Sequence, residues 1–325
     1  MVRIILRRLS GLIPQLLLLA LASFLLLQLA PGDFLTELRM NPRVSDELIT
    51  GLRHRYGLDQ PWHTQFVIWL SRIVRGDLGH SFLYNRPAGE LVIERAINTM
   101  TLAVSALCLT ALVAMPAGVL SARYRSLDRV GSILSTITLS VPSLLLAILA
   151  MLLAAGTGWF PIGGASSLDH ERFTAAGKAA DYLHHLLLPA IVLALRQIPS
   201  WFRQLHTAMR ETLTEDYILA ARSKGVPEKS VLFKHALRNA INPLITMFGG
   251  SMGSLLSGAF VVEVVMSWPG IGSLAVSSLL SRDLYVLMAC LIHAAILMAA
   301  GNLLADLVLS MTDPRIRRGE AAGGA

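Results

Sequence analysis

The sequence predicts an all-α protein that crosses a membrane several times. Of its 325 residues, 54% are hydrophobic and only 15% are charged, whereas soluble globular proteins average roughly 45–50% and about 25%. The apolar residues fall into runs of about 20, the length that a helix needs to cross a hydrocarbon core about 30 Å thick. This composition excludes a secreted disulfide scaffold, a nucleic-acid-binding domain and a disordered protein, despite the net charge of +7.

Six apolar runs are long enough to cross the membrane as helices. The first follows three arginines, as a secretory signal would, but it is longer than a signal-peptide core of about 7–15 residues, and no small-x-small cleavage pattern follows it. We therefore interpret it as a retained anchor. The predicted spans are residues 9–29, 99–120, 130–155, 186–205, 241–262 and 285–309.

An even number of spans places both chain ends on one side, and the basic residues predict which side. Lys and Arg crowd the N-terminus, the connections 121–129 and 206–240, and the C-terminal segment. The short connections on the opposite face carry only Arg172, Lys178 and Arg282. Because cytoplasmic connections are enriched in Lys and Arg, both termini are predicted to be cytoplasmic.

These spans also predict how the chain is organised. An N-terminal anchor with the first span is followed by a long extracytoplasmic loop, a core transmembrane region and a cytoplasmic tail. The core region contains a cytoplasmic loop at residues 206–240. The predicted regions are, in this order, 1–30, 31–98, 99–309 and 310–325.

Within the extracytoplasmic loop, residues 62–74 are predicted to form an amphipathic helix. Trp62, Phe66 and Trp69 recur at helical spacing with polar residues between them. Such a helix lies on the membrane surface or on the spans. A small lid on the protein's own core and a direct contact with substrate are the two alternatives for its role.

Two spans carry small residues at every fourth position, which lets helix backbones approach closely. Both faces are therefore predicted to meet other helices. The small residues are Ala114, Gly118 and Ala122 in the second span and Gly250, Ser254 and Gly258 in the fifth. Bends are predicted where a proline removes a helical hydrogen bond, at Pro116, Pro142 and Pro199.

Ionisable residues inside the spans are few, and they do not predict a catalytic group. Asn302 and Asp306 share a helix face, whereas His293 lies on another side of the same helix. Arg196 lies in mid-span and is a candidate partner for Asp306. Because no nucleophile has a nearby base, no catalytic residue is expected.

The sequence also predicts no bound cofactor or metal in this chain. It has no Gly-x4-Gly-Lys-Ser/Thr loop for ATP and no cluster of metal ligands at the usual spacing. Cys108 and Cys290 lie in apolar runs, where a thiol behaves as a small hydrophobe. His184 and His185 stand together at the outer end of the fourth span, either to contact a metal substrate or simply solvated.

The cytoplasmic loop 206–240 holds the most informative segment. Asp216 or Thr214 can cap a short helix that ends at Gly225, because glycine readily adopts the positive φ of a helix end. A turn with proline then leads to a second helix, predicted from about Lys229. Two short helices at the membrane surface suit a docking element for a cytoplasmic partner, and a basic solvated loop is the alternative.

At this loop the sequence resembles the permeases of binding-protein-dependent ABC importers, in their dipeptide, oligopeptide and nickel family. The hallmark of these permeases is Glu-Ala-Ala-x-x-x-Gly. Here Ala220, Ala221 and Gly225 match, and Leu219 replaces the Glu. The later Ile-x-Leu-Pro is also absent, as is usual in the peptide branch. The resemblance continues along the chain at 56–61, 76–81, 263, 267–272, 282–283, 302, 306 and 313–315.

The resemblance implies the type I fold of ABC importer permeases and a division of labour in a bacterial inner membrane. Two homologous permeases form the pathway, two cytoplasmic ATPases bind ATP and magnesium, and an extracytoplasmic binding protein delivers substrate. This chain would be one multi-pass half of the pathway, without enzymatic activity of its own. The residues expected to form its ATPase-coupling helix are Asp216, Tyr217, Ala220, Ala221, Lys224 and Gly225.

A second matching segment is expected to form a rigid turn at the outer mouth. It would gate the path or face the binding protein, or else serve only as a structural turn. Its residues are Glu263, Trp268, Pro269 and Gly270. Asn302, Asp306 and the segment 313–315 are assigned to helix packing and C-terminal anchoring.

The expected function is ATP-driven import of short peptides, either dipeptides or oligopeptides. The same type of complex for nickel or glutathione is an alternative, since no residue of this chain decides the cargo. A secondary transporter driven by an ion gradient is a further alternative, but it would place paired charges or broken helices in related repeats near the midplane. A membrane-embedded hydrolase is disfavoured by the missing acid/base pair.

Overall fold

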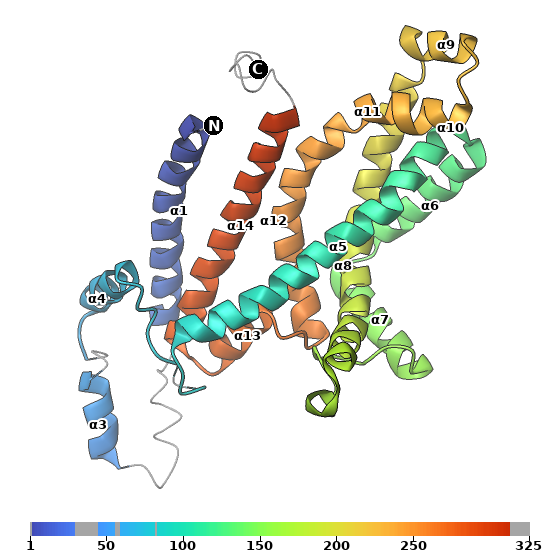
Figure 1. The fold of residues 1–325 in the computed structure, drawn as a ribbon. Helices are drawn as coiled ribbons and strands as arrows, with labels where there is room; N and C mark the ends of the chain where they lie inside the picture. The colour runs from blue at the N-terminus through green and yellow to red at the C-terminus, as the bar shows by residue number, and fades with distance from the viewer. Residues whose placement is uncertain (1, 30–44, 56–58, 82, 313–325) are drawn as a thin grey trace. The chain divides into compact units, whose positions relative to one another are not determined.

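The computed structural model describes residues 2–29, 45–55, 59–81 and 83–312, and every regular element among them is helical (Figure 1). A 3-10 turn (η1, His170–Arg172) and a π-helical segment (η2, Val231–Ala236) join the α-helices. The α-helices are α1 (Val2–Leu29), α3 (Asp46–Arg55), α4 (Trp62–Val74), α5 (Ala88–Arg123), α6 (Arg125–Ser140), α7 (Ser143–Thr157), α8 (Ala175–Thr212), α9 (Asp216–Ser223), α10 (Glu228–Ser230), α11 (Leu237–Ala240), α12 (Asn242–Val265), α13 (Ile271–Leu280) and α14 (Leu284–Thr312).

Among the described residues, three helices are long and apolar enough to cross a membrane, and two bent pairs raise this number to five. The three are α5, α8 and α14, and they contain the second, fourth and sixth predicted spans. The described side chains of α1 include an apolar helical segment, Ile13–Leu25, which is shorter than the 18 residues required of a span. The structure is therefore that of an all-helical membrane protein, and the number six stays a prediction.

The span predicted at 130–155 is wrong as one continuous helix. Helices α6 and α7 meet there at an angle of 102°. Pro142 lacks an N–H to donate, and a residue before proline is driven out of the helical region; accordingly Val141 is extended, with φ −91° and ψ 124°. The bend predicted at Pro142 is thus confirmed as a complete break.

The segment after the predicted fifth span contains a helix that sequence analysis missed. Helix α12 is bent by 53°, and α13 is a separate apolar helix. The ten residues of α13 are too few to cross a membrane, which takes about 20, so its apolar composition did not mark it as a span.

The chain folds into two compact units. The first holds the described residues of Met1–Ile5, Met100–Trp268 and Met298–Ala325, and the second holds those of Leu6–Thr99 and Pro269–Leu297.

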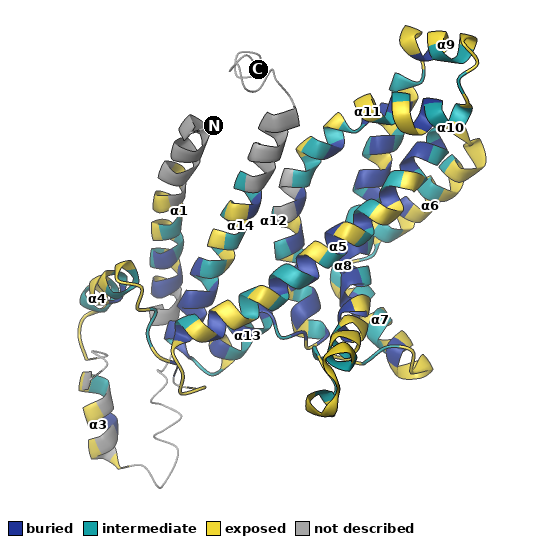
Figure 2. Ribbon diagram, in the orientation of Figure 1, coloured by how far each residue is buried: buried dark blue, intermediate teal, exposed yellow. Residues whose placement is uncertain are grey.

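In the first unit α8 is the central helix and contacts α6, α7, α11 and α12. Its buried residues extend from His185 to Met209, whereas the first ten residues of the helix are exposed or half-buried (Figure 2). A Cβ added to Gly118 would lie 3.0 Å from Leu205, and one added to Gly258 would lie 3.0 Å from Leu193. Both predicted small-residue faces therefore meet α8, which confirms their role in close packing. The side chain of Asn302 similarly faces Gly253, at 3.9 Å from its added Cβ.

In the second unit, the amphipathic helix predicted at 62–74 is confirmed as α4. Its Phe66 and Trp69 pack against Phe24 of α1, with ring centroids 5.5 and 6.5 Å from the Phe24 ring. This contact favours the lid on the protein's own core. Val67 and Ile68 remain exposed on α4.

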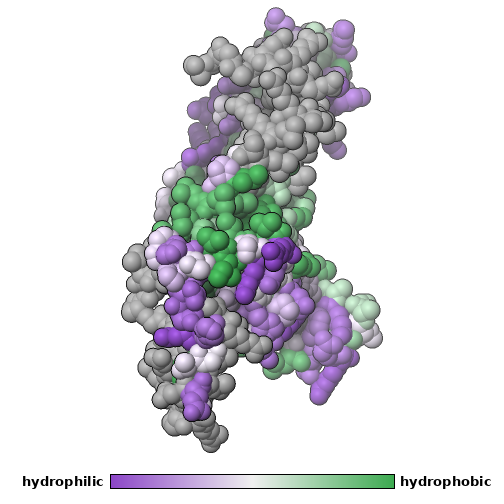
Figure 3. All heavy atoms as spheres, turned by 90° about the vertical axis from the view of Figure 1, so that its left-hand side faces the viewer, coloured by the Kyte–Doolittle hydropathy of each residue, from purple (hydrophilic) through white to green (hydrophobic). Residues whose placement is uncertain are grey.

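Helix α1 also exposes apolar side chains. Figure 3, which faces the α1 side of Figure 1, shows apolar residues gathered in a patch beside hydrophilic ones. Among the described side chains of α1, the large apolar ones that are exposed are Ile13, Leu17, Leu18 and Leu25. Such a surface fits contact with lipid.

Candidate functional site

Helix α9 and the residue after its C-terminal cap bring together the residues that were predicted for a coupling helix. Helix α9 lies past the ends of α5 and α8 in the first unit (Figure 1). Of the six predicted residues, Ala221 is half-buried, and the exposed ones are Asp216, Tyr217, Ala220, Lys224 and Gly225. The segment therefore presents small and polar side chains outward, and its docking role stays a prediction.

The N-terminus of α9 differs from the predicted cap. Glu215 is the cap residue and makes no side-chain capping hydrogen bond. The Thr214 hydroxyl donates to the Glu211 carbonyl at 2.7 Å instead, and Asp216 is already helical. The predicted cap by Asp216 or Thr214 is therefore wrong, because Thr214 is engaged by the end of α8.

Helix α9 stops before Gly225, as predicted, with Ser223 as its last residue and Lys224 as its C-cap. The Val226 N–H donates to the Ala221 carbonyl at 3.2 Å, and the Gly225 N–H donates to the Arg222 carbonyl at 2.9 Å. This pair of bonds is the Schellman motif, which places its glycine in the left-handed region. Gly225 has a φ of +76° and nothing within 4 Å of an added Cβ. Backbone conformation, and not lack of space, therefore favours glycine here.

Two contacts hold α9 on the rest of the loop, and sequence analysis named neither. Ile218 is fully buried in the same apolar cluster as Val231 and Leu232 of the π-helical segment. The amide of Asn239 donates to the Tyr217 hydroxyl at 2.8 Å. Ile218 is the one buried side chain of α9, and an apolar residue in the first turn of a short polar helix was the available signal.

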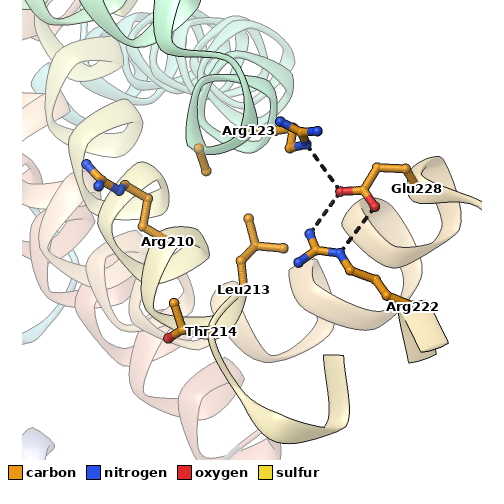
Figure 4. A pocket seen from close by; sticks show the side chains of 7 residues that line it. Arg123, Arg210, Leu213, Thr214, Arg222 and Glu228 are labelled. Atoms are coloured by element: carbon orange, nitrogen blue, oxygen red, sulfur yellow. Dashed lines mark hydrogen bonds and ion pairs between the residues drawn. The ribbon is translucent and has the colours of Figure 1, made fainter. Parts of the chain in front are cut away.

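An ion-pair cluster joins α9 to α10 and to the end of α5. The Arg222 guanidinium donates to both carboxylate oxygens of Glu228, at 2.9 and 3.3 Å. Arg123, the last residue of α5, lies 3.4 Å from the same carboxylate. Figure 4 shows the two arginines converging on Glu228. A bidentate arginine–carboxylate pair fixes geometry as well as charge. Since Arg123 pairs with the same carboxylate, α9 is linked through Glu228 to α5, which contains a predicted span.

Because of this cluster, the stability of the loop is expected to fall when the pH becomes acidic. The hydrogen bond from Arg222 lowers the pKa of Glu228 below its ordinary value of 4.5, and the charges of Arg222 and Arg123 act in the same direction. A carboxyl whose pKa is lowered by folding contributes stability above its unfolded pKa and loses it as the pH falls through the folded value. We expect Glu228→Gln to lower the melting temperature of the purified complex at neutral pH.

Below the folded pKa of Glu228 the two proteins should melt alike, because the wild-type carboxyl is then neutral as well. Melting temperatures measured across the acid range check this. Glu215→Gln is the control, since Glu215 is exposed and makes no capping bond. An unchanged difference between Glu228→Gln and wild type at all pH values would contradict the ion-pair explanation.

The residues predicted for the outer-mouth turn are largely buried. Glu263 lies near the end of α12 and is fully buried. Trp268 is also fully buried, in the first unit, with its ring 5.5 Å from that of Tyr182. In the second unit Gly270 is the N-cap of α13, and the Pro269 carbonyl accepts from the Asn98 amide at 2.9 Å. The gating or docking role of this turn stays a prediction.

A buried carboxylate in the second unit joins two of the segments that carry the family resemblance, residues 76–81 and 282–283. The Ser81 hydroxyl donates to Asp283 at 2.6 Å, and the Leu83 N–H donates to the same oxygen at 3.1 Å. Asp283 and Ser81 are both buried. Nearby, an added Cβ on Gly79, whose φ is +88°, would lie 2.6 Å from the Tyr285 ring. These contacts fasten the described residues 79–81 and 83 to the start of α14.

The other polar residues named from the sequence do not assemble into a reactive site. His184 donates to the Trp159 carbonyl at 2.9 Å and His185 to the Asp181 carbonyl at 2.8 Å. In the part of the chain that the structure describes, no group of three or more His, Cys, Asp or Glu could hold a metal ion.

The pairing predicted between Arg196 and Asp306 stays untested. Arg196 is exposed on α8, and the side chain of Asp306 lies outside the described residues, as does the segment 313–315. His293 donates to the Ala289 carbonyl at 2.9 Å.

The fold is that of a polytopic membrane protein, and comparison with known proteins gives its class, a transport permease. Two family models match the chain. The binding-protein-dependent transport system inner membrane component matches residues 114–318, and the corresponding N-terminal component matches residues 1–103. The chain belongs to this family of binding-protein-dependent transport permeases, which confirms the resemblance to ABC importer permeases of the peptide and nickel type.

Relatives are similar over nearly their whole length. The oligopeptide transport system permease protein AppB of Bacillus subtilis is 40% identical over 96% of this chain and 98% of its own length. A putative peptide transport system permease protein of Brucella abortus is 38% identical over 98% and 99%. The glutathione transport system permease protein GsiC of Salmonella choleraesuis is 35% identical over 98% and 99%.

Proposed function

We propose that this chain is one of two membrane subunits that form the translocation pathway of an ATP-driven importer for short peptides. The observation that carries the proposal is the end-to-end similarity to permeases named for peptide, oligopeptide and glutathione transport. Glutathione is itself a tripeptide, so all three names fall into one chemical class of cargo. Nickel remains the alternative cargo considered from the sequence.

In this proposal the membrane is the bacterial inner membrane, and six spans place both termini in the cytoplasm. The Arg and Lys residues of the loop that contains α9 support this orientation. The partners are a second homologous permease, two cytoplasmic ATPases that bind ATP and magnesium, and an extracytoplasmic binding protein. This chain supplies no catalytic residue and binds no cofactor.

Helix α9 is the coupling helix in this mechanism. The exposed Ala220 allows close approach to an ATPase groove, while Ile218 holds the helix from beneath. When ATP closes the ATPase dimer, the groove moves α9. The Arg222–Glu228–Arg123 cluster passes that displacement to α5, and the spans then open alternately to the two sides.

ATPase activity of the assembled complex tests the proposal. The chain is co-expressed with its neighbouring permease and ATPases and placed in lipid nanodiscs. ATP hydrolysis is then measured with binding protein that is empty or loaded with dipeptide, glutathione or nickel. We expect stimulation by a peptide-loaded form. Stimulation by the nickel-loaded form alone would identify nickel, and not a peptide, as the cargo. Failure to form a complex with any ATPase would contradict the importer function.

A further inference from the structure

A hollow with a volume of about 580 Å³ opens beside the ion-pair cluster in the first unit (Figure 4). Its walls come from the end of α5, the end of α8, and the α9 and α10 helices. The side chains labelled in the figure are Arg123, Arg210, Leu213, Thr214, Arg222 and Glu228. Three arginines therefore line one opening together with a single carboxylate.

The hollow carries excess positive charge. Arg123 and Arg222 share the Glu228 carboxylate, which neutralises only one of them. Arg210 lies on the opposite wall in Figure 4, where its guanidinium is directed away from this cluster, and no described carboxylate forms a salt bridge with it. Guanidinium groups present several donors in a plane, an arrangement that matches the oxygens of carboxylate and phosphate groups. An anion would balance this charge.

The hollow lies at the ends of two helices that can span a membrane, and this position indicates which kind of anion can reach it. Arg123 ends α5, and Arg210 lies in the last turn of α8. Both helices are long and apolar enough to cross a membrane. Tyr124 follows Arg123, is 48% exposed, and lies under its guanidinium with 5.7 Å to the ring centroid. Exposed tyrosines are enriched at the level of lipid headgroups, and we therefore infer that the hollow lies near that level.

We propose that this hollow binds a phosphate-bearing anion, and that the headgroup of an anionic phospholipid supplies it. The guanidinium of Arg210 and the N–H groups of Arg123 and Arg222 that do not bind Glu228 contact the phosphate. Leu213 contacts the glycerol backbone of the lipid. Basic pockets at the ends of spans bind anionic headgroups in this way. An occupied hollow would fix the distance between α5, α8 and α9, which is the region that the proposed coupling uses.

A binding measurement on the whole complex tests this site without ATP or transport, so its result is independent of the importer function. Short-chain phosphatidylglycerol, short-chain phosphatidylcholine and inorganic phosphate are titrated in turn into the detergent-solubilised complex. Binding is followed by native mass spectrometry. The variant is Arg210→Gln, which leaves the Glu228 cluster intact. The control is Arg238→Gln, an exposed arginine of the same loop that does not line the hollow.

We expect phosphatidylglycerol to bind in preference to phosphatidylcholine, and Arg210→Gln to weaken that binding about tenfold, as the loss of one charged hydrogen bond would. Arg238→Gln should bind like wild type. Binding of inorganic phosphate with the same dependence on Arg210 would support the site and assign it to soluble phosphate. If neither ligand binds, or if the two variants bind alike, the proposal is overturned.

Discussion

Replacing Gly225 by valine is expected to abolish substrate uptake while the chain still reaches the membrane. Gly225 has a φ of +76° at the end of α9, a conformation that costs an ordinary residue roughly 1–2 kcal/mol and is rarer still for a β-branched one. The Schellman bonds to Ala221 and Arg222 would break. Uptake by membrane vesicles, with chain abundance measured by immunoblot, checks this result.

Gly225→Asn is the matched control, because asparagine adopts the left-handed conformation more readily than other non-glycine residues. It adds a side chain of similar size into the same open space. We expect this variant to retain most of the uptake. Normal transport by Gly225→Val would show that the end of α9 does not matter for coupling, and equal loss in both variants would show that the added bulk matters instead of the backbone.

Asp283→Ala is expected to release Ser81 and Leu83 from the start of α14. The change leaves the Ser81 hydroxyl and the Leu83 N–H without their acceptor. The buried Ser81 hydroxyl left unpaired costs about 1–3 kcal/mol, and the Leu83 N–H, whose bond is only part-buried, costs less. Hydrogen exchange at residues 83–84 should therefore become faster, and the melting temperature of the complex should fall.

Asp283→Asn separates the loss of these bonds from the loss of charge, since its amide oxygen still accepts. We expect its hydrogen exchange to stay close to that of wild type. Ser81→Ala removes one of the two donors to Asp283 but also the hydroxyl that accepts from the Tyr84 N–H, so it is compared at Leu83 alone, where its exchange should fall between the two variants. If Asp283→Ala exchanges no faster than wild type at residues 83–84, Asp283 does not fasten this segment.

Local patterns in the sequence predicted much of the fold. The helix at 62–74 follows from apolar spacing alone, and it forms with those bounds. The span at 130–155 was predicted as one continuous helix because hydropathy reports how apolar a segment is and not the direction of its helix axis. Pro142 breaks the helix, but the run of apolar residues continues across it. Helix α13 escaped notice for the opposite reason, since it is apolar but short.

Some features of the candidate site could likewise be predicted from the sequence, and others could not. The glycine that ends α9 could be predicted, because its conformational role is local. The partners of Arg222 and Arg123 could not, since charged residues in a basic loop are usually solvated and only the fold shows which of them meet. Asp283 and Ser81 are separated by 202 positions, so their contact depends on the packing of distant segments and not on any motif.

The two attachments of α9 have a mechanical consequence. Ile218 holds the helix near its beginning, and Arg222 holds it near its end. The two contacts therefore act at opposite ends of α9, and only the one at the end of the helix continues to α5, through Glu228 and Arg123. In the proposed coupling, a displacement of α9 would reach α5 through Arg222, while the burial of Ile218 keeps the beginning of the helix on the loop. Ile218→Ala would then loosen α9 on the loop and leave the Arg222–Glu228–Arg123 cluster intact.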